Sequence, residues 1–335
     1  MKGTNSKRTP TVFAVLLLCF FAGCGVIPQQ KELLTVDFKK DQTLRYKFVS
    51  SRDILVEFNT NRNKTKSEKN KVDKFSESME MVVAYTPTEV DPYDLTTIKA
   101  TCESVNANRD SKSGRSAVKS DAVEYSAGKS FTFTVDPRGK IEDYSQLNEL
   151  VKQMGEKAFR PNTERGKVKE PDMISDFVAT QWFLWDAVSS IEKYTEGVAK
   201  GQSWKSKLSV PTPMVMRQAR DVTYTLAEIR NNPKGRIAVI RSSYSLAESV
   251  PASWPIPYTG RFQMSGMFGF LTNYKVLGLQ GEGEELFNID AGRTEQYNQH
   301  YQMELEASLM MGIGAGSKVT IKQNLVMQLL ENEQK

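Results

Sequence analysis

The sequence is short of the side chains from which most metal and nucleophilic sites are built. It contains one histidine, His300, and three cysteines, Cys19, Cys24 and Cys102. A single histidine cannot form the usual multi-histidine metal sites. Cys19 lies in the first 23 residues and Cys24 directly follows them, so Cys102 is the one cysteine left in the body of the chain, and it can form neither an intramolecular disulfide nor a cysteine cluster. We therefore expect no metal, no cofactor and no catalytic residue.

The chain also lacks a marked excess of charge. It has 45 basic and 40 acidic residues, a net charge of +5. Three of the basic residues, Lys2, Lys7 and Arg8, belong to the first 23 residues, which leaves +2 for the remainder. A nucleic-acid-binding domain is typically clearly basic. We therefore expect no nucleic-acid partner.

No apolar stretch is long enough to span a membrane as a helix. The longest apolar run, Val12 to Ala22, has about eleven residues, whereas a transmembrane helix needs roughly 20. This run follows the basic residues at the N-terminus and ends in small residues, which is the pattern of a secretory signal.

The end of this run, Phe21-Ala22-Gly23-Cys24, resembles the bacterial lipobox, with Phe21 in place of the usual Leu. The resemblance implies cleavage before Cys24, thioether lipidation of its thiol, and acylation of the new amino terminus. Stable anchoring takes more than one acyl chain. Gly25 follows the cysteine, where inner-membrane lipoproteins often have Asp, so the resemblance implies the outer membrane, facing the periplasm. A chance cysteine in an ordinary signal and an uncleaved anchor are the alternatives.

Apolar and polar residues alternate through most of the remaining chain, which is typical of half-buried strands. In residues 43–59, Leu44, Tyr46 and Phe48 share one face, and Ser50 and Arg52 interrupt it, which favours a bend or bulge there. Predicted units are a leader (1–23), a tether (24–42), an antiparallel β block (43–144), a helical segment (145–200) and a second antiparallel β block (201–335).

The helical segment has apolar residues at spacings of three and four. A first helix begins near Ser145, and a second, after Pro171, has a stripe wide enough to be buried on more than one side. The expected fold class is α+β, mainly antiparallel β, with a curved meander sheet or sheets packed on two central helices. The pattern leaves open whether the two β blocks form one sheet.

Candidate chemistry is sparse. Glu282, Glu284 and Glu285 could serve as paired carboxylates in a hydrolase, but strand alternation puts Glu285 on the opposite face from the other two, and a solvated strand face is the ordinary interpretation. His300 lies on a polar strand face and is predicted to be exposed. Cys102 is predicted to be a small core residue.

One set of apolar side chains has two interpretations. It either forms ordinary core or lines a cavity that holds an acyl chain. The residues of this set are Phe177, Trp182, Trp185, Met264, Phe268 and Phe270.

The overall pattern is similar to that of uncharacterised bacterial lipoproteins. It also resembles, in architecture, the periplasmic lipoprotein carriers, which implies a curled sheet closed by helices over a lipid-sized cavity. The leading hypothesis is a non-enzymatic, lipid-anchored envelope protein that binds a hydrophobic ligand. The alternatives are a structural lipoprotein that binds a protein partner or the cell wall, with an exposed patch near Pro251 to Leu271, and a carboxylate-based hydrolase.

Overall fold

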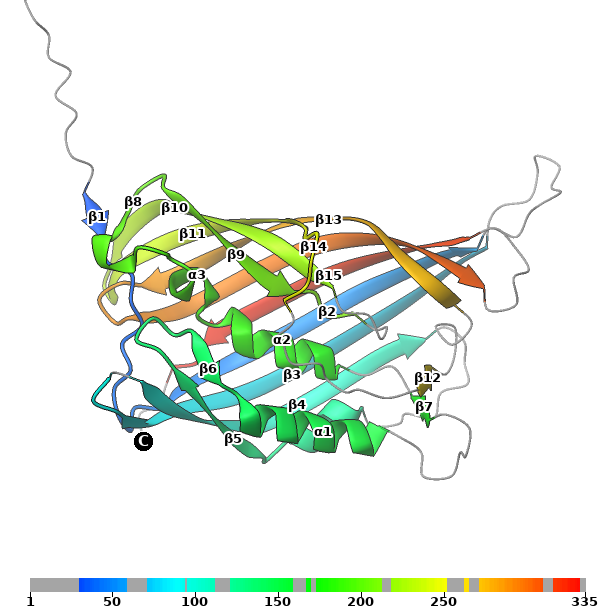
Figure 1. Cartoon of the computed structure of the whole chain (residues 1–335), viewed down its shortest axis with the longest axis horizontal. Coiled ribbons are helices and arrows are strands. Elements are labelled where there is room, and N and C mark those ends of the chain that lie inside the picture. Colours follow the sequence, from blue (N-terminus) through cyan, green and yellow to red (C-terminus); the bar gives the residue numbers. More distant parts are fainter. Residues whose placement is uncertain are drawn as a thin grey trace, which may run out of the picture.

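The protein is built on one large antiparallel sheet (Figure 1). The computed structural model describes residues 30–58, 71–93, 95–111, 121–158, 167–169, 173–212, 218–251, 262–264, 271–309 and 316–331. Eleven strands of the described chain follow one another across the sheet in the order β6-β5-β4-β3-β2-β15-β14-β13-β11-β10-β9. Almost every neighbour in this order is also a neighbour in sequence, as expected for a meander of hairpins.

The strands come from both predicted β blocks. The N-terminal block supplies β2 (Leu44–Phe58), β3 (Lys71–Val90), β4 (Thr96–Ser111), β5 (Ser130–Val135) and β6 (Ile141–Asp143). The C-terminal block supplies β9 (Ser203–Ser209), β10 (Ala219–Asn232), β11 (Gly235–Leu246), β13 (Leu271–Asn288), β14 (Arg293–Leu309) and β15 (Ser317–Leu329). The first and last of these strands, β2 and β15, pair from Glu57↔Lys318 to Tyr46↔Leu329, and this pairing joins both blocks in one sheet.

The helices lie on one side of the sheet, which curves round them (Figure 1). We call this side the inner face. The helices are α1 (Ser145–Ala158), α2 (Ile174–Phe183) and α3 (Asp186–Ser189), with short 3-10 turns η1 (Ala122–Ser126) and η2 (Tyr194–Glu196). Almost all of α2 is buried, as the width of its apolar stripe predicts. In the described part of the chain, no helix is long and apolar enough to cross a membrane.

Four short strands form two smaller sheets. One joins β1 (Lys31–Glu32) to β8 (Val198–Ala199), and the other joins β7 (Lys167–Lys169) to β12 (Phe262–Met264). The sheet of β1 and β8 attaches the first described residues to the rest of the protein. Residues 30–42 differ from the flexible tether expected of them, because Leu34 and Val36 are buried and the Asp37 amide donates to the Gly292 carbonyl at 2.9 Å.

Strand β2 corrects one expectation. Its residues alternate strictly between buried and partly exposed, and its register with β3 and β15 continues without a shift through Ser50 and Arg52. The expected bulge is therefore wrong. The side chains of Ser50 and Arg52 instead point into the core, where they form hydrogen bonds and ion pairs with other buried polar groups.

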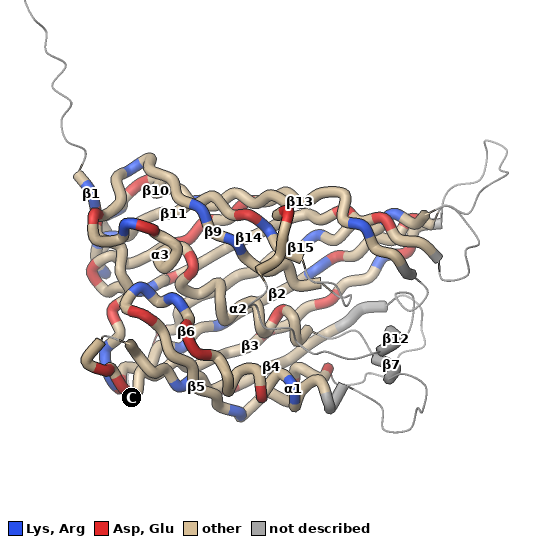
Figure 2. Tube along the Cα trace, in the orientation of Figure 1, with Lys and Arg blue, Asp and Glu red and all other residues tan. Residues whose placement is uncertain are grey.

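A glycine forms the turn between β5 and β6. Gly139 has a φ of 93° between β5 and β6, a left-handed conformation that glycine adopts at little cost. The charged side chains of both signs are spread along the strands instead of gathering in one region (Figure 2).

Candidate ligand-binding site

A row of mainly polar residues crosses the inner face at one register position. Residues directly opposite each other on paired strands lie side by side on the same face. Here the succession runs over six neighbouring strands, from β3 to β11. The members of this polar row are, in order, Glu77, Arg52, Gln323, Tyr301, Gly281 and Tyr244.

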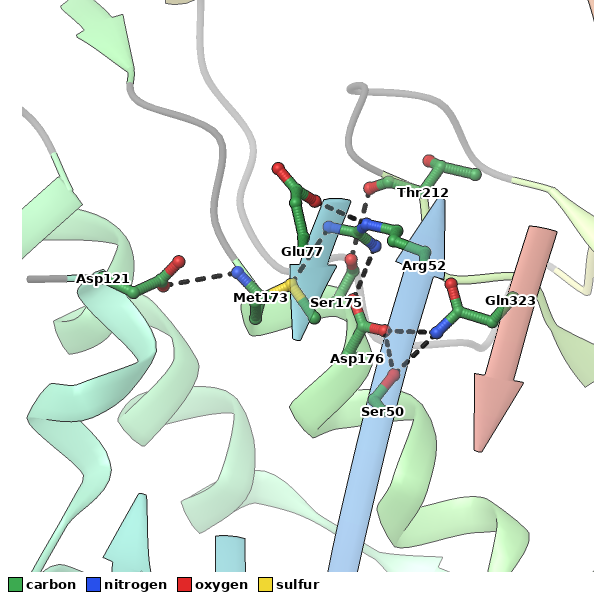
Figure 3. A network of polar contacts seen from close by, with 9 residues as sticks. All are labelled: Ser50, Arg52, Glu77, Asp121, Met173, Ser175, Asp176, Thr212 and Gln323. Atoms are coloured by element: carbon green, nitrogen blue, oxygen red, sulfur yellow. Dashed lines mark hydrogen bonds and ion pairs between the residues drawn. The ribbon is translucent and has the colours of Figure 1, made fainter. Parts of the chain in front are cut away.

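At one end of the row, Arg52 is fully buried and neutralised by two carboxylates (Figure 3). Its Nε donates to Glu77 Oε2 at 2.6 Å, and its Nη1 donates to Asp176 Oδ2 at 2.7 Å. Burial alone would lower the pKa of Arg52, but the attraction of Asp176 and Glu77 outweighs it, so the pKa lies above its ordinary value. Asp176 stands on α2, so this cluster ties the helix to the middle of the sheet.

The second oxygen of Asp176 completes the cluster. Oδ1 accepts hydrogen bonds from Ser50 Oγ at 2.7 Å and from Gln323 Nε2 at 3.0 Å. Every charge in this cluster has a partner, which is the arrangement that a buried ion pair requires to be tolerated.

Near the other end of the row lies Arg220, from β10, which is also fully buried. Its guanidinium carbon is 4.2 Å from the ring centre of Tyr244, 4.6 Å from that of Tyr301 and 5.0 Å from that of Phe183. Its Nη2 donates to Gln299 Oε1 at 2.5 Å. Three aromatic rings and one amide oxygen thus surround the cation.

Two glycines of β13 make room for this arrangement. A Cβ at Gly281 would lie 2.4 Å from the Cβ of Tyr301, and a Cβ at Gly283 would lie 2.5 Å from the hydroxyl oxygen of Tyr244. Real Cβ atoms do not approach so closely. The glycines therefore allow the two tyrosine side chains to lie over β13 and to reach Arg220.

The Arg220 region concentrates polar atoms that have no hydrogen-bond partner. Most buried polar groups in native proteins are hydrogen-bonded, and exceptions call for an explanation. Among the described residues, eight buried side-chain atoms lack a partner. Four of the eight belong to three residues of this region: Arg220 (Nε and Nη1), Gln299 (Nε2) and Tyr301 (OH).

Two buried carboxyl groups lie further along the inner face. Asp186 accepts hydrogen bonds from Ser206 and Tyr224 at 2.9 and 2.7 Å, and burial raises its pKa to about 6 against the effect of these bonds. Burial also raises the pKa of Glu285 to about 8, against a 2.6 Å hydrogen bond from Thr294. Glu285 is therefore mostly protonated at pH 7 and is a poor candidate for a carboxylate nucleophile.

The other candidate groups lie as alternation predicts. Glu282 and Glu284 are on the outer face, opposite in direction to Glu285, and His300 is exposed beside Glu282, with 3.5 Å between His300 Nε2 and Glu282 Oε1. Cys102 is buried, and burial raises the pKa of its thiol to about 12. In the described part of the chain, no group of three His, Cys, Asp or Glu side chains is placed to hold a metal ion.

The structure brings some of the predicted ligand-binding residues together and separates others. Phe177 and Trp185 lie in one aromatic cluster, in which they contact opposite ends of the Phe131 and Phe133 pair. Trp182 is only partly buried and packs on Tyr144, with 5.4 Å between ring centres.

The structure does not describe the side chains of the remaining predicted residues. Met264 belongs to β12, and its side chain is not among those described; Phe268, Phe270 and the lipidation site Cys24 lie outside the described residues, as does most of the Pro251 to Leu271 patch. Ligand contact by these six side chains stays a prediction.

Sequence reasoning missed Arg52 and Arg220 as site residues. Arg220 shares the parity of Val222, Tyr224 and Leu226, so alternation alone indicates that it points inward. Arg52 likewise has the parity of the apolar residues of β2. Both residues could therefore have been identified from one pattern, a charged residue at an inward-facing position of a long strand.

Comparison with known proteins identifies no function. Residues 93–234, less than half of the chain, match a family model described as "Family of unknown function (DUF6263)". The match runs from β4 to β10 and includes Asp176 and Arg220, but not Arg52, Gln299 or Tyr301. A comparison with curated proteins found no match.

One solved structure shows a distant similarity. A chain from the structure titled "Lipid-protein interactions in lipovitellin" aligns with a TM-score of 0.43 and 9% sequence identity, over 88% of this chain and 26% of that chain. This protein thus spans about a quarter of the length of that chain. A similarity at this level carries no information about function.

Proposed function

We propose that the protein is a non-enzymatic lipoprotein of the bacterial cell envelope that binds a hydrophobic ligand with an acyl chain between its curved sheet and its helices. The architecture supports this proposal, because the inner face is apolar along most of its strands and is covered by helices instead of a second sheet.

The observation that carries the proposal is the group of unpartnered polar atoms on this apolar face. A core that only stabilises the fold gains nothing from a buried cation that no carboxylate contacts, because removing a charge from water is costly. A site for an amphipathic molecule needs both parts: apolar side chains for the chain, and a few converging polar groups that fix its orientation.

The location is proposed from the leader. Lipidation of Cys24 would hold the protein on a membrane, and we propose the outer membrane, facing the periplasm. The test is to express the full chain in a bacterium and determine the mass of its N-terminal peptide. The expected peptide begins at residue 24 and carries a thioether-linked lipid and an acylated amino group. A peptide that begins elsewhere, or an unmodified Cys24, would overturn the anchor.

Ligand binding is tested on residues 25–335, which retain every described residue and lack the lipid site. Native mass spectrometry and lipid extraction should find a stoichiometric acyl-chain species, and Trp182→Ala should reduce its occupancy. Tyr93→Ala is the matched control, because it removes an aromatic ring whose residue is 84% exposed. A ligand-free mass that does not change when lipids are offered would overturn the proposal and favour a solid core that binds a partner.

A further inference from the structure

The two buried arginines of the inner face differ in how their charges are balanced. Arg52 has two carboxylate partners within 2.7 Å. Arg220 has none: the described part of the chain contains no ion pair to it, and its one hydrogen bond goes to the neutral amide of Gln299. Leaving a buried charge unpaired is strongly destabilising, so Arg220 is retained against a cost to stability.

The nearby carboxyl groups form no ion pair with Arg220 in the described part of the chain, although Asp186 and Arg220 attract each other electrostatically. Both oxygens of Asp186 already accept hydrogen bonds, from Ser206 and Tyr224. Glu285 is bound to Thr294 and is mostly protonated at neutral pH, because burial raises its pKa to about 8. The faces of the three aromatic rings around Arg220 attract its positive charge. The rings do not replace hydrogen-bond acceptors, however, because the N–H groups of Nε and Nη1 point outward in the plane of the guanidinium.

The unpartnered atoms around Arg220 are mainly donors. Arg220 offers Nε and Nη1, the Gln299 amide offers Nε2, and Tyr301 offers its hydroxyl. All three side chains are at most 4% exposed. Tyr301 can lie over the guanidinium because Gly281 has no side chain that would collide with it. Several donors around a cation match a group that has more than one acceptor oxygen and a negative charge.

We propose that Arg220, Gln299 and Tyr301 bind an anionic head group, a carboxylate or a phosphate monoester, at the end of the polar row. A planar guanidinium is suited to this role, because it can donate two parallel hydrogen bonds to two oxygens of one anion. The identity of the ligand as a lipid rests on the proposed function, whereas the anion site rests on the contacts of Arg220. Together they describe a fatty acid or a phosphorylated lipid with its head group inside the protein and its chain along the apolar face.

The test uses the full chain in detergent micelles with three probes. These are decanoate labelled with ¹³C at its carboxyl carbon, decanol labelled at the equivalent carbon, and inorganic phosphate observed by ³¹P resonance. A protein-bound carboxyl signal is distinguished from the micellar one by its chemical shift. The first variant is Arg220→Met, and the matched control is Arg241→Met, which removes an exposed arginine from the adjacent strand β11.

Arg220→Met should weaken decanoate binding by about tenfold to a hundredfold, the usual effect of losing a hydrogen bond to a charged group. Decanol binding should not change, and Arg241→Met should affect neither probe. Tyr301→Phe keeps the ring over Arg220 and should weaken decanoate binding by a smaller factor. Ligand-free Arg220→Met should melt at the same or a higher temperature than the parent chain, because the unpaired charge is gone.

The outcomes separate the two proposals. If decanoate and decanol bind equally and Arg220→Met changes neither, the head-group site is overturned and the hydrophobic function stands. If neither binds but phosphate does, and Arg220→Met abolishes that signal, the site takes a free anion and the lipid function is overturned. If Arg220→Met does not fold, an unchanged decanoate affinity in Tyr301→Phe overturns the head-group site. If no probe binds, both proposals fail, and the conclusion is that water alone satisfies the buried donors.

Discussion

Arg52 and Asp176 connect the middle of the sheet to helix α2 through a buried ion pair, with 2.7 Å between Arg52 Nη1 and Asp176 Oδ2 and side chains at most 1% exposed. The two residues are 124 positions apart in the sequence. Because Asp176 also accepts hydrogen bonds from Ser50 and Gln323, one helix side chain fixes α2 against two adjacent strands. The position of α2 on the inner face therefore depends on polar contacts as well as on its apolar surface.

Removing the negative charge of Asp176 should destabilise the fold. Asp176→Ala removes the acceptor that Arg52, Ser50 and Gln323 share, while Glu77 still balances the charge of Arg52. Leaving buried donors unsatisfied in this way costs about 1–3 kcal/mol. The measurement is the free energy of unfolding from urea titrations. The control is Glu284→Gln, which removes an exposed partner of Arg241 and should cost less than about 1 kcal/mol. Equal effects of the two changes would contradict the assignment.

The absence of a side chain at position 281 should be critical. A Cβ at Gly281 would lie 2.3 Å from the carbonyl oxygen of His300, so Gly281→Ala should destabilise the protein by about 1–3 kcal/mol. Gly278→Ala, on the same strand, meets no atom within 4 Å and should be nearly neutral. Thermal unfolding of both variants measures the difference, and a neutral Gly281→Ala would show that Tyr301 can move away without cost.

The stability of the protein should fall as the pH rises through the slightly acidic range. The pKa of Glu285 is about 8 in the folded protein, against an ordinary value of 4.5. Its contribution is therefore fully present below about pH 4.5 and is lost as the pH rises to about 8, because the unfolded chain ionises first. The slope approaches about 1.4 kcal/mol per pH unit within this window.

Asp186 acts in the same direction over a lower window, from 3.8 to about 6. The Glu285→Gln variant should therefore flatten the stability profile between pH 6 and pH 8, and below pH 6 it should leave only the decline that Asp186 causes. Urea midpoints at half-unit steps of pH would measure this. A profile identical to that of the parent chain would show that Glu285 is solvated in the folded state.

The thiol of Cys102 should be unreactive until the protein unfolds. It is fully buried, and burial raises its pKa to about 12, so the reactive thiolate is rare at neutral pH. In a chain of residues 25–335 it is the single cysteine. Ellman's reagent should react with it in 6 M guanidinium within minutes and much more slowly in buffer. Fast reaction in buffer would indicate that the edge near η1 opens readily.

Local patterns predicted most of the secondary structure because hairpins are local. The alternation in β2 and the wide apolar stripe of α2 each involve residues close in sequence, so their physical causes can be read there. The buried position of Cys102 and the exposed position of His300 followed from the same alternation. The carboxyl group of Glu285 was placed on the correct face, but nothing local showed how deeply that face is buried.

The sequence by itself determined which residues form strands and helices and which strand faces are apolar, because these depend on a period of two or of 3.6. Only the tertiary structure decided that β2 pairs with β15, and that Glu77, Arg52, Gln323 and Tyr301 therefore lie in one row. Ser50 and Arg52 looked like interruptions because their partners on α2 and β15 are distant in sequence. The structural role of a polar residue on an apolar strand face depends on the groups that pack against it. Those contacts form only when strands distant in sequence pair.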